Sequence, residues 1–537
     1  MKKIFILIVS IAVLASCTDV LDIAPTDRLS ETAIWSDATL PQLFVNAQYN
    51  TIQHGFNNDI QYYGDEAYSK FNDGGYQIIG LNQLTSSNVS GLSGKYYYWK
   101  NAYNTIKNFN IYFSKIDGTP LTPEAKVSLT AEVKFIRAFV YAQLIWNYGG
   151  VPIVEKGFDL SDDLKGLTRN TYDECVTYIL KDLEDAIAGL PDQQTGANLG
   201  RASADAARAL KARVLLYWAS PLNNPTDDKA RWQQAADAAL AIINSNRYSL
   251  TNSYHNLFIG GNNSEAIFSR YFSTDISHQI GKTFAPIGSG GNGYGQPSQN
   301  IVDEYEMTNG VIPVINGVKN PDPLNTYDES NPYVDRDPRF HASVLYNGAI
   351  YKGREIEPFV GGADNFGPDA TATGYYNFKF LDETQVVSGT TPYTYPWHIF
   401  RLAEIYLIYA EAAYNLGNEA DARTYINLVR QRSGVNMPDV TTTGTALFNS
   451  LVHERRIELA FEGHRFYDTR RWKIAPITDA EPIVGFQVIK NGNGTFTYNR
   501  VNLLNRVWSD KLYLIPLSFQ EIQASGGSLT QNPGGYN

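Results

Sequence analysis

Long amphipathic segments with recognisable ends constrain the fold of this chain most. Over residues 171–190, apolar side chains recur at steps of three and four, which is the period of one helical face. Thr171 and Glu174 form a capping box, so the helix begins there. Near the C-terminus, a short link at 416–418 joins two further segments of this kind, which predicts an antiparallel helical hairpin.

The same signals predict an all-α fold built on a scaffold of helical hairpins. Alanine at the contact positions lets neighbouring helices approach closely, as in tetratricopeptide-like pairs, although a clean period of about 34 residues is lacking. Helices are expected over residues 122–148, 171–190, 203–219, 229–244, 398–416, 419–433 and 447–461.

Two long stretches break this helical pattern. Residues 54–98 and 251–395 are rich in Gly, Asn, Ser, Tyr and Pro, with only short strand-like runs. Connections of this length are either disordered or functional. Their aromatic residues argue against disorder. We therefore expect a rigid helical scaffold that carries long irregular ligand-binding loops.

The N-terminus has the pattern of an export signal. Lys2 and Lys3 precede an uncharged run at 4–15, which is too short to span a bilayer but matches the apolar core of a signal peptide. Cys17 follows small residues, as in a bacterial lipobox. We therefore expect residues 1–16 to be removed and the Cys17 thiol to be lipidated. A plain signal peptide with a chance cysteine is the alternative reading.

Charge and cysteine content narrow the class of protein. Removing residues 1–16 takes two lysines and no acid from 44 basic and 55 acidic residues, so the net charge moves from −11 to −13. Such acidity disfavours nucleic acid as a partner, because phosphate binding needs Lys and Arg. Cys175 is the one other cysteine, so an intramolecular disulfide is not expected.

Motifs for catalysis are incomplete. Residues 288–293 fit G-x-G-x-x-G, but no predicted strand precedes them. His453 and Glu454 lack the second histidine of a zinc helix. The alternating charges over 454–471 predict a structural ion-pair network. We expect no enzyme activity, no cofactor and no metal site, although the Asp- and Asn-rich loops are compatible with a structural calcium ion.

Several motifs, in order along the mature chain, resemble the SusD/RagB family of outer-membrane nutrient-binding lipoproteins. The densest is 454–468, ERRIELAFEGHRFYD, followed by Arg471 and Trp472. Each motif alone is weak, but the ordered set is specific. The others include 135–141 (FIRAFVY), 148–152 (YGGVP), 200–203 (GRAS), 336–340 (RDPRF), 401–404 (RLAE) and 531–536 (QNPGGY).

This resemblance implies a single SusD-like domain over 17–537, with an N-terminal part to about 250 and a C-terminal part from about 251. It implies four tetratricopeptide-like pairs overlaid by loops. It also implies a lipid anchor on the outside of the Gram-negative outer membrane, and a role as the lid of a SusC-like TonB-dependent transporter. Members capture oligosaccharides or polysaccharides without catalysis, whereas the RagB branch handles peptides. A peptide receptor is therefore the alternative function, and an extracellular glycoside hydrolase a remote one.

The loops offer candidate binding residues. A glycan reader needs aromatic faces for sugar C–H surfaces and a few polar side chains for hydroxyls. Residues 61–99, with Asn101 just beyond, and 271–296 both supply such side chains, the second stretch including Tyr271 and Phe272. We predict that the ligand site contains Trp99, Asn101, Tyr76 and Tyr294. The alternative for each is packing in the core or between loops, and Trp99 in particular begins a predicted helix.

Overall fold

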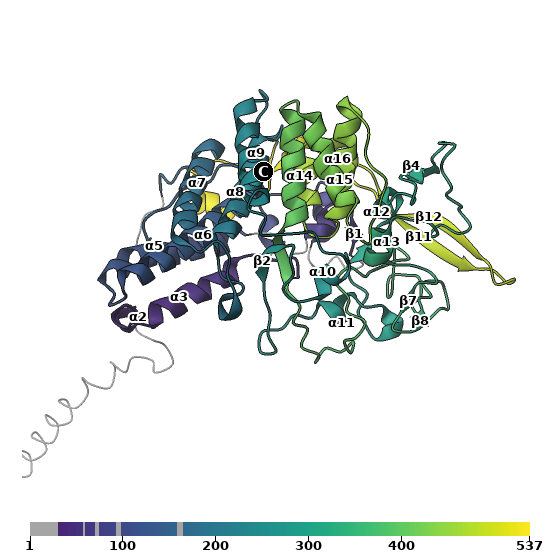
Figure 1. The fold of residues 1–537 in the computed structure, drawn as a ribbon, viewed down its shortest axis with the longest axis horizontal. Coiled ribbons are helices and arrows are strands. Elements are labelled where there is room, and N and C mark those ends of the chain that lie inside the picture. Colours follow the sequence, from purple (N-terminus) through teal and green to yellow (C-terminus); the bar gives the residue numbers. More distant parts are fainter. Residues whose placement is uncertain (1–30, 57–59, 70–74, 93–97, 158–164, 537) are drawn as a thin grey trace, which may run out of the picture.

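The computed structural model describes residues 31–536, apart from 57–59, 70–74, 93–97 and 158–164. The predicted leader and Cys17 lie outside this part. Long helices form the upper and left parts of the molecule in Figure 1, while short strands and irregular segments gather at the lower right. The fold is mainly helical, which confirms the predicted fold class.

Paired helices make the scaffold, and alanine-rich faces lie between them. Side-chain caps start three of these helices as predicted: Thr122, Thr171 and Ser203 each accept a hydrogen bond from a backbone N–H of the first turn. Helix α14 also packs on α9, which joins neighbouring pairs into one row. The pairs are α6 Pro123–Tyr148 with α7 Tyr172–Gly189, α8 Ala204–Ala219 with α9 Lys229–Ile243, and α14 Leu402–Asn415 with α15 Glu419–Arg430.

The remaining helices flank this row or lie in the loops. In the described part of the chain, no helix is both long and apolar enough to cross a membrane. The longer ones are α3 Leu40–Gln48, α5 Trp99–Lys115, α16 Gly444–Glu458 and α17 Arg465–Arg471. The short ones are α2 Glu31–Ser36, α4 Tyr76–Gly80, α10 Asn256–Ile259, α11 Ile280–Phe284, α12 Gln299–Glu304, α13 Pro338–Ser343, α18 Ala475–Thr478 and α19 Phe519–Ala524.

Strands occur as separate antiparallel pairs, six of them within the described residues. They are β1 Ala67–Tyr68 with β3 Gln296–Pro297, β2 Ala266–Arg270 with β10 Trp397–Arg401, β4 Val314–Ile315 with β5 Val318–Lys319, β6 Val344–Leu345 with β9 Tyr376–Asn377, β7 Ile350–Tyr351 with β8 Arg354–Glu355, and β11 Ile483–Lys490 with β12 Phe496–Leu504. The β11–β12 hairpin, which projects at the right of Figure 1, was not predicted from the sequence.

Three predicted helices have other ends in the structure. Helix α15 ends at Arg430 rather than at 433, and α16 spans Gly444–Glu458 rather than 447–461, since local signals place helix ends less well than the helices themselves. The helix expected over 398–416 begins at Leu402, because His398–Arg401 belong to strand β10. Strand β10 pairs with β2, and the Leu402 N–H donates to the Glu265 carbonyl at 3.0 Å. A partner far away in the sequence therefore holds these residues extended, against their local helical period.

Aromatic side chains fix the irregular segments on the scaffold. The Phe56 ring lies 5.1 Å from the Trp397 ring and 4.2 Å from the His278 ring, measured between centroids. Gly55 lies so close to Trp397 that an added Cβ would be 2.0 Å from the indole. Segments distant in sequence are thus packed together around β10, and Gly55 and Trp397 line a small hollow there.

Candidate ligand-binding groove

A groove in two adjoining parts runs along strand β2, which lies near the centre of Figure 1. The parts have volumes of about 390 and 200 Å³. The larger falls within the usual range for small-molecule sites, about 300–1,000 Å³. Both parts share the lining residues Leu199, Gly200, Arg201, Phe268, Ser269 and Tyr271.

Two aromatic residues line both parts of the groove, and of these Phe268 is buried whereas Tyr271 is partly exposed. It follows β2 directly and is half-buried, and its hydroxyl donates to Asn262 Oδ1 at 3.1 Å. Burial raises the pKa of the Tyr271 phenol, so the hydroxyl stays protonated at neutral pH. A partly exposed ring whose hydroxyl is held by a hydrogen bond suits sugar C–H surfaces and hydroxyls.

Gly200 gives that ring its space. Its φ is +88°, a conformation that L side chains rarely adopt. A Cβ added at Gly200 would lie 3.0 Å from Cδ2 of Tyr271. The glycine therefore serves both the turn before α8 and the close approach of the tyrosine.

Polar side chains surround these two residues. In the larger part they come mainly from the 193–203 connection and from the turn before β2. Amide and hydroxyl groups of this kind can donate to and accept from sugar hydroxyls in several directions. The larger part includes Gln193, Gln194, Thr195, Ser203, Asn262, Asn263 and Ser264, and Asn46 lines the smaller part.

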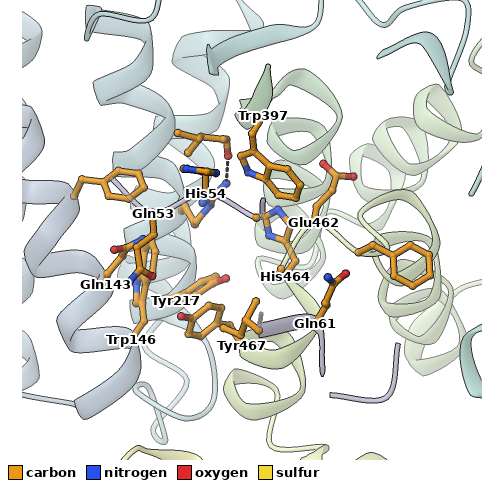
Figure 2. A pocket seen from close by; sticks show the side chains of 17 residues that line it. Gln53, His54, Gln61, Gln143, Trp146, Tyr217, Trp397, Glu462, His464 and Tyr467 are labelled. Carbon is orange, nitrogen blue, oxygen red and sulfur yellow. Dashed lines mark hydrogen bonds between the residues drawn. The ribbon is translucent and has the colours of Figure 1, made fainter. Parts of the chain in front are cut away.

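A second hollow, shown in Figure 2, lies between α6, α8 and β10 and is much smaller, about 70 Å³. Trp146, Tyr217 and Tyr467 point toward it from one side and Trp397 from another. The buried atoms Gln61 Oε1 and Gln143 Oε1 accept no hydrogen bond from the described residues. The volume of this hollow is far below the usual range for small-molecule sites, about 300–1,000 Å³, so the hollow suits water rather than a sugar ring.

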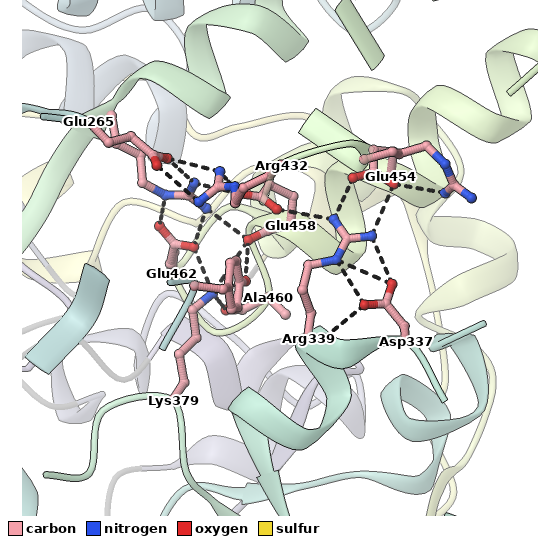
Figure 3. A network of polar contacts seen from close by, with 12 residues as sticks. Glu265, Asp337, Arg339, Lys379, Arg432, Glu454, Glu458, Ala460 and Glu462 are labelled. Atoms are coloured by element: carbon pink, nitrogen blue, oxygen red, sulfur yellow. Dashed lines mark hydrogen bonds and ion pairs between the residues drawn. The ribbon is translucent and has the colours of Figure 1, made fainter. Parts of the chain in front are cut away.

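The end of β2 opposite to Tyr271 is held by a buried ion-pair network, shown in Figure 3. Glu265, just before β2, binds Arg401 and Arg432, both at 2.9 Å. The same two arginines bind Glu458 at 2.7 and 2.6 Å. The network confirms that the charges over 454–471 have a structural role, and it fixes the strand that carries the groove.

The electrostatics of this network explain why its acids stay ionised. Burial alone would raise the pKa of Glu458, but Arg432, Arg401 and Arg339 lower it to about 2. Burial lowers the pKa of Lys379 to about 8, although Glu462 opposes this at 2.7 Å. A charged cluster with its partners in place is costly to disturb, so it acts as a fixed support.

The structure places the four predicted ligand residues in different surroundings. Trp99, 3 % exposed, packs against Tyr103 and Tyr148 at the start of α5. Asn101 is exposed on the first turn of the same helix.

Tyr76 is half-buried beside Tyr62 and Tyr63. Tyr294 is also half-buried and donates its N–H to the Thr283 carbonyl. The ligand role of all four residues stays a prediction.

Comparison with known proteins gives the family. The sequence profile of the SusD family matches residues 243–536, which is more than half of the chain. The chain belongs to the SusD family. A second profile, described as starch-binding and associating with the outer membrane, matches residues 19–216 of this SusD-family chain. A third, for a prokaryotic membrane lipoprotein lipid attachment site, matches residues 1–18, which include Cys17 and fit a lipid-anchored outer-membrane protein.

Relatives span most of this SusD-family protein. SusD-like protein P25 of Formosa agariphila is 27 % identical, covering 86 % of this chain and 87 % of its own. The starch-binding protein SusD of Bacteroides thetaiotaomicron is 25 % identical, covering 73 % of this chain and 72 % of its own. The crystal structure of a SusD-like protein from Bacteroides fragilis has a TM-score of 0.81 at 29 % identity, covering 95 % of this chain and 100 % of that one.

The sequence points to only some of the residues that line the groove. Tyr271 lies among the aromatic residues of the loops, and Arg201 lies in the GRAS motif at 200–203. Tyr248 and Asn262 had no signal of their own. The composition of 251–395 pointed to binding loops, but only the packing of 193–203 against β2 selects these side chains.

Proposed function

We propose that this protein is a cell-surface glycan-binding lipoprotein. It captures oligosaccharides or polysaccharides and delivers them, as a lid, to a SusC-like TonB-dependent transporter in the outer membrane. Family membership and the starch-binding relative support the glycan class. The lipoprotein attachment site supports the anchor, and Cys17 is the residue that would carry the lipid.

The groove along β2 is the observation that carries this proposal. Its larger part offers about 390 Å³, an aromatic face at Tyr271 and a lining of amides and hydroxyls. Oligosaccharides need this combination of stacking surface and divergent hydrogen bonds. The hollow of Figure 2 is too small for the purpose, and Trp99 presents almost no surface to a ligand.

A binding screen tests the function. The soluble form, residues 18–537, is titrated by calorimetry against plant, host and microbial glycans and against a peptide digest. The expected result is a glycan hit without release of reducing ends, which separates capture from hydrolysis. A peptide hit with silent glycans would move the protein to the RagB-like alternative, and release of reducing ends would support the hydrolase.

A variant test then places the ligand. Tyr271→Ala is expected to lower glycan affinity at least tenfold, because the stacking face is lost. Phe519→Ala removes an aromatic ring that is 59 % exposed on α19, outside the groove, and serves as the matched control. Loss of binding in Asn101→Ala or Tyr294→Ala, with Tyr271→Ala unaffected, would place the ligand at the residues predicted from the sequence instead.

A further inference from the structure

The charged residues that line the groove are all basic, although the protein as a whole is acidic. Its lining contains Arg201, Arg247 and Arg270, whereas none of the described residues that line either part is an aspartate or glutamate. The chain as a whole has 55 acidic and 44 basic residues. The hollow of Figure 2 contains Glu462, and a surface pocket between α7, α8 and α9 contains Glu184 and Asp237.

Two of the three arginines are paired with buried carboxylates that do not themselves line the groove. Arg201 binds the buried Glu132 through two contacts of 2.6 and 2.7 Å. Arg247 binds both carboxylate oxygens of the buried Asp205 at 2.6 Å. These pairs fix the two guanidinium groups in place, and they leave the lining polar with little net charge of its own.

Arg270 differs from every other arginine in the described part of the chain. All the others bind a carboxylate or donate to backbone carbonyls. Among the described residues, the Arg270 guanidinium has one acceptor, Asn50 Oδ1 at 3.0 Å, and it lies 5.8 Å from the centre of the Phe272 ring.

The Arg270 guanidinium is half-buried, so it has lost part of its hydration, and one amide acceptor leaves most of its N–H donors without a partner among the described residues. Burial lowers the pKa of Arg270, and no carboxylate opposes that shift. The ordinary pKa of arginine lies so far above neutral that the group stays charged at neutral pH. An anion that reached it would therefore gain a charge-assisted, fork-shaped pair of hydrogen bonds.

We infer that the groove receives an acidic glycan, whose carboxylate or sulfate group pairs with Arg270 while a neighbouring sugar ring lies on Tyr271. This rests on the proposed glycan-binding function and names its substrate class. Arg270 is adjacent to Tyr271 in sequence, and both line the smaller part of the groove. The anionic group and the stacked ring would thus belong to the same or to neighbouring sugars.

Calorimetry with the soluble form tests the inference. The probes are oligogalacturonides, sulfated galactan oligosaccharides and a desulfated galactan of the same length. Arg270→Gln is expected to lose about ten- to hundredfold in affinity for the acidic probe that binds, with no change for the neutral one. Binding of the acidic probe should also weaken as salt is raised, and this dependence should shrink in the variant.

Controls keep the outcome interpretable. Arg423→Gln removes a half-buried arginine of α15 that pairs with Glu419 away from the groove, and it should leave affinity unchanged. Arg270→Lys keeps the charge without the fork and should retain part of the affinity. The melting temperature of each variant reports whether it folds.

The outcomes separate the two proposals. Binding of only the uronate or only the sulfated probe supports the inference and identifies the anionic group. Tight binding of the neutral galactan with no preference for acidic probes, or an Arg270→Gln variant that binds the acidic probe normally, overturns the inference and leaves the glycan function standing. If no glycan binds and a peptide from the digest does, the proposed function itself is overturned.

Discussion

The two ends of the β2–β10 pair each carry an arginine, and the two arginines differ in their partners. At one end Arg401 lies opposite Ala266 and binds the buried Glu265 and Glu458 and the partly buried Glu462. At the other end Arg270 lies opposite Trp397, and within the described residues its one hydrogen-bond acceptor is the Asn50 amide. We call the first the closed end, because its arginine is paired with carboxylates. We call the second the open end, because its arginine lies at the edge of the groove without a carboxylate among the described residues. Removing a carboxylate from the closed end would leave a buried charge uncompensated and destabilise the fold, whereas the Arg270 guanidinium has no carboxylate partner among the described residues.

The largest effect should come from breaking the closed end. Glu458→Gln leaves Arg432 and Arg401 short of a buried negative charge, so we expect a loss of about 3–5 kcal/mol in the free energy of unfolding. Urea denaturation followed by circular dichroism measures it. Lys181→Ala is the control, because its pair with Asp185 is exposed and should contribute less than about 0.5 kcal/mol. Equal stability of the two variants would contradict the assigned role of the network.

Acid should weaken the closed end in the same way. The folded pKa of Glu458 is lowered from 4.5 to about 2, so its contribution is full above 4.5 and is lost as the pH falls through the folded value. The advantage of the wild type over Glu458→Gln in unfolding free energy should shrink by about 3 kcal/mol across that range. Urea titrations of both proteins at a series of pH values measure the difference. An advantage that stays constant would be evidence against ionised Glu458.

At the open end, Gly200→Ala should affect both stability and binding. The positive φ should cost about 1–2 kcal/mol in stability, measured by urea denaturation. The new methyl group would also press on Tyr271 and weaken ligand binding, measured by calorimetry. Gly348→Ala is a matched control, since its φ is +84° and nothing lies within 4 Å of the added Cβ. The two variants should lose similar stability, and only Gly200→Ala should lose affinity; equal affinities would remove Gly200 from the groove.

The smallest effect should come from Tyr271→Phe. It removes the hydrogen bond to Asn262 and keeps the ring, so stability should fall by less than about 1 kcal/mol. Glycan affinity should fall less than in Tyr271→Ala, because the stacking face remains. Thermal melting and calorimetry compare the two substitutions. If Tyr271→Phe and Tyr271→Ala lose affinity equally, the hydroxyl rather than the ring makes the decisive contact.

The sequence predicted those elements whose signals are local. Helix α7 begins where the capping box of Thr171 and Glu174 puts it, and α14 and α15 meet at the short link after Asn415. Cys175 lies buried on α7 as a free thiol, and burial raises its pKa to about 11. Such signals lie within a few residues of one another, so they read correctly before any tertiary contact is known.

Tertiary structure decided what depends on distant partners. Residues 398–401 form a strand because β2 lies beside them, although their local period is helical. Arg401 and Glu265 are 136 positions apart, and no spacing rule in a single sequence pairs them.

The groove likewise depends on segments that are distant in the sequence. Its walls come from 193–203 and from β2, and the lack of a carboxylate beside Arg270 depends on the residues that surround it in the fold. The helical scaffold, the lipoprotein signal and the family can be read from the sequence, because neighbouring residues encode them. Which charges are paired with carboxylates and which one is not depends on the fold, because burial and pairing are set by the whole chain.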